Sequence, residues 1–240
     1  MSLRKQVDAA GGEILADTRF YLPKTFDKAM FLKSASEFLK DYPVDGFQVG
    51  LQLSTDPSHY PVLKKLIEAI KELNVTATLK LSILPSDWQK MDGIAEMVDR
   101  AVIKLRPVVQ KDVEVFNTDR FAQDLIKNAV RVGLNPNKLI LVVPLLARSD
   151  SESSDLGYSN AIYDLGADPR GNGSAFLNGT GYFFFSQTRA IEKVALAKKY
   201  GLHGIGLEGG GSFANEDLYP WDAKSLFHAI ASSSGRRLTE

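Results

Sequence analysis

The stretch Gly46-Phe47-Gln48-Val49-Gly50-Leu51-Gln52-Leu53 decides the fold class of this chain. Its apolar residues alternate strictly with glutamine or glycine, which is the period of a β-strand with two different faces. A strand of an open parallel sheet, covered by helices on both faces, normally carries apolar residues at nearly every position. One polar face fits a barrel strand instead, with inner side chains that lead towards a polar site at the carboxyl ends of the strands.

Strand and helix patterns alternate on both sides of this stretch. Six apolar runs have the composition of strands and cover about residues 13–19, 46–54, 76–84, 100–106, 138–147 and 203–208. Residues with helical spacing follow each run; Val62, Leu66 and Ile70, for example, fall on one stripe after the second run. Repeated strand–helix units are typical of a parallel sheet with helices outside it. We therefore expect an α/β fold of the (β/α)8 TIM-barrel type, incomplete and with about six βα units.

Composition and charge exclude several classes of function. The 240 residues carry 29 basic and 29 acidic side chains, which gives no electrostatic reason to expect a nucleic-acid partner. The longest apolar run, at 139–147, is too short to span a bilayer. The chain has no cysteine, and its three histidines lie far apart, so we expect no disulfide and no metal site. A glycine pattern at 204–209 lacks the helix that a dinucleotide fingerprint needs after it, so no cofactor is expected.

No linker divides the chain, so residues 1–240 are predicted to form a single domain. The longest stretch without periodicity covers about residues 149–181 and is rich in Ser, Gly, Asn and Asp. Irregular loops of that length in a compact domain are usually functional or mobile. We therefore expect a long irregular loop there.

Three motifs, in the same order along the chain, resemble glycoside hydrolase family 18, the chitinases and their inactive relatives. Residues 45–52, Asp-Gly-Phe-Gln-Val-Gly-Leu-Gln, stand in place of the family's Asp-Gly-x-Asp-x-Asp-x-Glu on its fourth barrel strand. Residues 137–149 are similar to the family's seventh strand, and residues 197–208 are similar to its last helix-to-strand passage. The resemblance covers about residues 5–230 and makes the first apolar run the third barrel strand.

The first two strands of such a barrel have no counterpart here. On this resemblance the chain is either a fragment of a longer one, or another segment or copy closes the sheet. Six units without closure leave two open strand edges, which predicts association into a homo-oligomer. The resemblance, together with glycosylation sequons at Asn74, Asn172 and Asn178, favours secretion without fixing the compartment.

The resemblance also implies that the family's catalytic acids are missing. In the family, the glutamate of the fourth-strand motif protonates the leaving oxygen, and the adjacent aspartate orients the acetamido group of the substrate. Those positions are Gln52 and Gly50 here, and the inner aspartate is Gln48. A glutamine cannot deliver a proton, and positioned acid catalysis contributes roughly 10²–10⁴ in rate. We therefore expect no catalytic residue at these positions and no chitinase activity by the family mechanism.

Carboxylates at other strand ends offer an alternative. Asp17 and Glu208 fall at predicted carboxyl ends of strands, where barrel enzymes keep catalytic groups. Lys80, Lys104 and Arg106 fall on alternate strand positions and would pair with them across the lumen. A salt-bridged lining is the favoured interpretation, and a relocated active site is the second.

A ligand site is predicted at the same end of the strands, formed by Gln52, Lys104, Arg106, Trp88, Glu208 and Trp221. The two tryptophans follow predicted strands and would rim the pocket, with core packing as the alternative. Three hypotheses result. The chain is an inactive chitinase-like protein that binds an oligosaccharide or a protein partner, a hydrolase with relocated carboxylates, or a structural and assembly protein.

Overall fold

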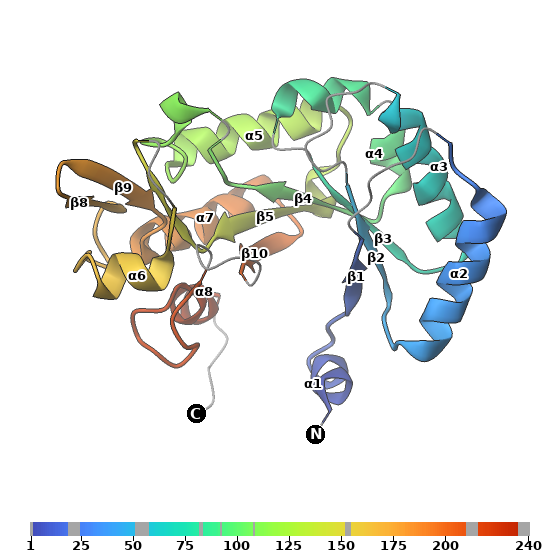
Figure 1. Ribbon diagram of the computed structural model, residues 1–240, viewed down its shortest axis with the longest axis horizontal. Coiled ribbons are helices and arrows are strands. Elements are labelled where there is room, and N and C mark those ends of the chain that lie inside the picture. Colours follow the sequence, from blue (N-terminus) through green and yellow to red (C-terminus); the bar gives the residue numbers. More distant parts are fainter. Residues whose placement is uncertain are drawn as a thin grey trace. The chain divides into compact units, whose positions relative to one another are not determined.

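A computed structural model describes residues 2–18, 25–50, 58–81, 84–91, 93–107, 109–151, 155–209 and 216–234 (Figure 1). The chain groups into two compact units. The N-terminal unit comprises Met1–Val102 and Asn128–Lys138, and the C-terminal unit comprises Ile103–Lys127 and Leu139–Glu240. Gln52 and the end of the predicted second strand lie outside the described residues.

The N-terminal unit is built from short parallel strands that alternate with helices. Its elements are α1 (Leu3–Ala9), β1 (Leu15–Asp17), α2 (Lys28–Asp41), β2 (Gly46–Val49), α3 (His59–Glu72), β3 (Thr76–Lys80), the 3₁₀ helix η1 (Pro85–Lys90), α4 (Ile94–Met97), the first part of β4 (Arg100–Lys104) and the 3₁₀ helix η3 (Pro136–Lys138). The predicted apolar stripe of α3 is buried, including Val62, Leu66 and Ile70. This stripe makes α3 the helix with the most buried residues in the unit.

The C-terminal unit combines the end of the parallel sheet with a second sheet. Its elements are the end of β4, the 3₁₀ helix η2 (Gln110–Asp112), most of α5 (Asp119–Arg131), β5 (Leu139–Pro144), β6 (Leu146–Ser149), β7 (Leu156–Gly157), α6 (Tyr158–Tyr163), β8 (Ser174–Leu177), β9 (Thr180–Phe184), α7 (Gln187–Tyr200), β10 (Gly204–Glu208) and α8 (Leu226–Ser233). α7 begins where the Ser186 hydroxyl accepts a hydrogen bond from Arg189 N, and it ends at Gly201, whose φ of 62° suits glycine.

The parallel sheet has six strands in the order β1-β2-β3-β4-β5-β10. Neighbours in this order are also neighbours along the chain, apart from the strands inserted between β5 and β10. This order confirms the predicted α/β fold of TIM-barrel-like type with six βα strands. Each strand lies within one of the six apolar runs.

The predicted long irregular loop at 149–181 is wrong. β6, β7, β8 and β9 form an antiparallel sheet in the order β7-β6-β9-β8, and α6 lies in the same stretch. β8 and β9 form a hairpin (orange in Figure 1) that turns at Asn178 and Gly179, whose φ angles of 51° and 84° match a type I′ turn. The described part of this stretch therefore consists of short strands and one helix joined by turns.

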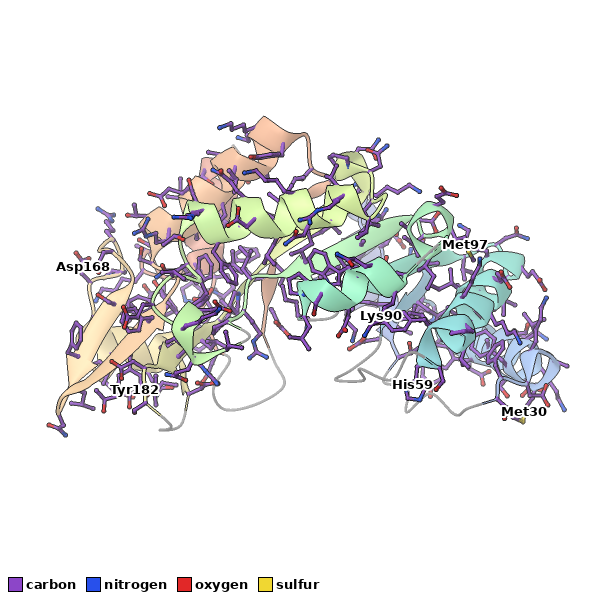
Figure 2. All side chains as sticks on the ribbon, turned by 90° about the horizontal axis from the view of Figure 1, so that it is seen from above. Met30, His59, Lys90, Met97, Asp168 and Tyr182 are labelled. Carbon is purple, nitrogen blue, oxygen red and sulfur yellow. The ribbon has the colours of Figure 1, made fainter. Side chains whose placement is uncertain are left out.

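Burial gives the second sheet an inner side. Tyr182 on β9 (labelled in Figure 2) and Phe184 on the same strand are buried, with the Phe184 ring 6.0 Å from that of Tyr158. Phe176 on β8 is 71% exposed. Among the helices of the described ranges, none combines the length and the apolar character that crossing a lipid bilayer requires.

Candidate functional site

The carboxyl ends of β1, β2 and β3 bring three polar side chains together in the N-terminal unit. The parallel register places Asp17 opposite Gln48, and the Gln48 amide nitrogen lies 3.4 Å from Asp17 Oδ1. The Lys80 ammonium forms an ion pair with the same carboxylate oxygen. The predicted pairing of Asp17 with Lys80 is therefore observed, and this carboxylate is engaged by a cation and an amide.

Position 50 has no room for an acidic side chain. A Cβ atom built on Gly50 would lie 2.6 Å from the Lys80 carbonyl oxygen and 2.8 Å from the Lys80 Cβ, both far inside normal contact distance. β2 and β3 also approach closely at Gly46, where a Cβ atom would lie 2.0 Å from Thr76 O. The absence of a carboxylate at position 50 is thus part of how these two strands pack. Gln52, the position of the family's proton donor, lies outside the described residues.

A second polar cluster lies in the C-terminal unit, at the ends of β4 and β10. Lys104 Nζ lies 2.5 Å from Glu208 Oε1, and Arg106 Nε lies 3.9 Å from Glu208 Oε2. Glu208 Oε2 is buried and accepts no hydrogen bond from any residue that the structure describes. These contacts show the predicted pairing of Glu208 with Lys104 and Arg106, so that each carboxylate oxygen faces a cation.

The two predicted rim tryptophans have opposite environments. Trp88 is 2% exposed, which contradicts its prediction as a ligand-binding residue. The 3₁₀ helix η1, which also carries Lys90 (labelled in Figure 2), begins at Pro85 and turns the indole of Trp88 into the core of the N-terminal unit. Trp221 is 73% exposed, and its ring is stacked on that of Tyr219, with the centroids 4.9 Å apart and the planes 5° from parallel.

Tyr219 of this stacked pair lines a pocket of about 440 Å³, and none of the lining residues was among the predicted site residues. Tyr163, Glu216, Asp217, Tyr219 and Asp222 are among the lining residues. The segment that carries four of them docks on α6, since Ser159 N donates to Glu216 O over 3.0 Å. In the sequence, the run Tyr219-Pro220-Trp221 could have indicated this site, because two aromatic residues around a proline are unusual in a solvated loop.

Hydrogen bonds order the polar side of the pocket. The Tyr163 hydroxyl donates to Asp222 Oδ2 over 2.9 Å, and this hydrogen bond raises the pKa of Tyr163. Asp217 accepts hydrogen bonds from the backbone N–H groups of Leu226 and Phe227 at the start of α8. Burial raises the pKa of Asp217, and those hydrogen bonds oppose the shift.

The histidines lie on separate elements. His59 begins α3 (labelled in Figure 2), His203 precedes β10, and His228 lies in α8. Within the described ranges, no group of three His, Asp or Glu side chains is placed to hold a metal ion.

Comparison with solved structures identifies the fold. Catalytic domain 2 of the Ostrinia furnacalis Group II chitinase matches with a TM-score of 0.68 and 13% identity, over 98% of this chain and 81% of that one. A family 18 chitinase from Flavobacterium johnsoniae matches with a TM-score of 0.72 and 15% identity, over 96% and 78%. A Rhizomucor miehei chitinase matches with a TM-score of 0.71 and 15% identity, over 97% and 87%. The chain therefore has a chitinase-like fold, as the three motifs predict.

Sequence comparison adds no closer relative. No protein-family model matches the chain, and no curated protein matches it by sequence. The identities of 13–15% to the chitinases establish the fold alone.

Proposed function

We propose that the chain binds carbohydrate and does not hydrolyse it by the family 18 mechanism. The observation that carries this proposal is the exposed, stacked pair Tyr219–Trp221 beside an open pocket. Exposed aromatic faces next to polar groups mark binding surfaces, and such faces suit the apolar face of a sugar ring. The chitinase-like fold supports carbohydrate as the ligand class, as an analogy between folds.

Three features support the absence of hydrolysis. The motif positions are Gln48, Gly50 and Gln52, and the close approach of β3 excludes a side chain at position 50. Asp17 is engaged by Lys80 and Gln48 in the N-terminal unit. A relocated active site would need a carboxylate free to approach a glycosidic oxygen, which Asp17 does not offer.

The cluster around Glu208 argues against the relocated hydrolase in the same way. Glu208 is held by Lys104 and faces Arg106, so a substrate would have to break an ion pair to reach either oxygen. We propose a structural role for this cluster as part of a salt-bridged strand end. Among the described residues that were predicted to bind a ligand, Trp221 is the most exposed.

Calorimetric titration with β-1,4-linked tetramers of glucosamine and N-acetylglucosamine tests the proposal, with mass spectrometry of the same samples to detect cleavage. The expected result is saturable binding of at least one tetramer and no shorter product after prolonged incubation. Cleavage by the purified chain, lost in Glu208→Gln, would establish the relocated hydrolase instead. No binding of either tetramer would overturn the carbohydrate proposal.

Self-association through a strand edge is a second candidate. β10 ends the sheet order, and a pocket of about 670 Å³ lies along it, lined mainly by apolar residues that include Val194, Leu202, Ile205, Leu207 and Ile230. His203 N donates to Leu139 O on β5, so alternation turns the N–H groups of Gly204 and Gly206 to the opposite edge. Open apolar edges of this kind favour pairing between chains.

Light scattering after size exclusion, over a hundredfold range of protein concentration, measures the association. The expected result is a mass that rises with concentration in the wild type and stays at the monomer value in Ile205→Lys. A monomer at every concentration would remove this candidate.

A further inference from the structure

The pocket beside Tyr219 and Trp221 is lined by negative charge. Three carboxylate residues line it, Glu216, Asp217 and Asp222. No lysine, arginine or histidine is among the described residues of the lining. Lys224 and His228 face Asp222 from outside the lining and lower its pKa, so they offset part of the charge of that carboxylate and leave Glu216 and Asp217 as the other acidic groups. The lining therefore favours a positively charged ligand group over a neutral or negative one.

The three carboxylates differ in what they already bind. Asp217 holds the start of α8 through backbone N–H groups, and Asp222 accepts from the Tyr163 hydroxyl and from Lys224 N. The Glu216 side chain is exposed, and it makes no hydrogen bond or ion pair with the described part of the chain. Glu216 is thus the carboxylate that a bound cation would meet first.

The same segment already places a cation against an aromatic ring. Lys224 Nζ lies 5.0 Å from the centroid of the Tyr163 ring, which is the geometry of a cation–π contact. Tyr219 and Trp221 are 71% and 73% exposed, and neither ring holds such a partner among the described residues. They offer aromatic faces on which a second cation would be stabilised in the same way.

We infer that this pocket selects amino sugars whose amino groups are free and protonated over their N-acetylated counterparts. The inference rests on the proposed carbohydrate binding and names the class of sugar. A protonated amine next to the sugar ring gains attraction from Glu216 and from the aromatic faces while the ring itself stacks. An acetamido group is neutral and bulkier, so it gains neither of these attractions.

The experiment compares two tetramers that differ only in the acetyl groups, tetraglucosamine and tetra-N-acetylglucosamine, by calorimetry at pH 6 and low ionic strength. We expect the free amine form to bind about tenfold more tightly. Trp221→Leu should weaken tetraglucosamine binding about fivefold to tenfold, and Glu216→Gln should weaken it about threefold. Phe176→Leu removes an equally exposed aromatic ring from β8 and serves as the matched control, with binding unchanged.

The outcomes separate this inference from the proposed function. Equal affinity for the two tetramers, or tighter binding of the acetylated one, overturns the selectivity and leaves carbohydrate binding intact. Binding of neither tetramer overturns both. The polyamine spermine, titrated in parallel, tests charge attraction alone. If spermine binds as tightly as tetraglucosamine, or if Trp221→Leu has no effect, the site does not recognise a sugar and the inference is wrong.

Discussion

Trp88 and Trp221 carry the same signal in the sequence, a tryptophan shortly after a strand, and they have opposite environments in the molecule. Trp88 is buried in the N-terminal unit, and Met91 and Ile94, which follow it, are buried as well. Trp221 is exposed in the C-terminal unit, between Pro220 and Asp222. The burial of the side chain itself, rather than its position after a strand, thus separates a tryptophan that stabilises the fold from one that is available to a ligand.

Replacing each tryptophan in turn gives the largest difference. Trp88→Ala should lower the free energy of unfolding by about 3–5 kcal/mol, because it leaves a cavity where an indole was fully packed. Trp221→Ala should lower it by less than about 0.5 kcal/mol. Urea denaturation followed by circular dichroism measures both. A loss in Trp221→Ala as large as in Trp88→Ala would show that Trp221 is a packing residue and would break the comparison.

Lys193 extends the comparison to a charged side chain. It is fully buried in the C-terminal unit, where it pairs with Asp119 and lies 5.9 Å from the Phe185 ring, and burial lowers its pKa. Lys193→Ala should cost about 3 kcal/mol of unfolding free energy, mainly because it removes the packing of the buried hydrocarbon chain.

Lys193→Met is the matched control, because it keeps the length and the packing of the buried chain without its charge. We expect its stability to stay within about 1 kcal/mol of the wild type. Equal losses in both variants would mean that the ion pair, and not the packed hydrocarbon chain, provides the stabilisation.

Asp217 extends the comparison of buried and exposed side chains to the pH dependence of stability. Because burial raises its pKa in the folded chain above the ordinary 3.8, the folded state binds the proton more tightly than the unfolded state. The contribution of this group to stability is therefore largest below pH 3.8 and decreases as the pH rises through the raised value. Asp217→Asn should remove this dependence, measured by urea denaturation between about pH 3.5 and 6. Parallel pH profiles for the two proteins would contradict the assignment.

Among the charged residues, the smallest effect is expected at Glu208. Its ion pair with Lys104 is partly exposed, so Glu208→Gln should change the free energy of unfolding by no more than about 1 kcal/mol. Lys104→Met provides the reciprocal control, since it removes the other partner of the same pair. A loss of unfolding free energy well above 1 kcal/mol in either variant would show that this pair contributes to stability as a buried ion pair does.

Sequence reasoning located all six parallel strands, because each is an apolar run bounded by helix signals. It missed the antiparallel sheet, because β7 has two residues and the exposed Phe176 on β8 breaks the buried alternation. It found Trp221 but missed Tyr219 and Glu216, since their segment has no periodicity. Only the docking of that segment on α6, through Ser159 and Glu216, shows that they line one pocket with Tyr163.

The tight packing of β2 against β3 also restricts the order in which sequence changes are tolerated. An aspartate introduced at position 50 would collide with the backbone of Lys80, so that single substitution carries a structural penalty before it brings any chemistry. β3 would first have to move away from β2. An acidic side chain at position 50 therefore requires coupled changes in both strands, which is an epistatic constraint on this one position of the motif.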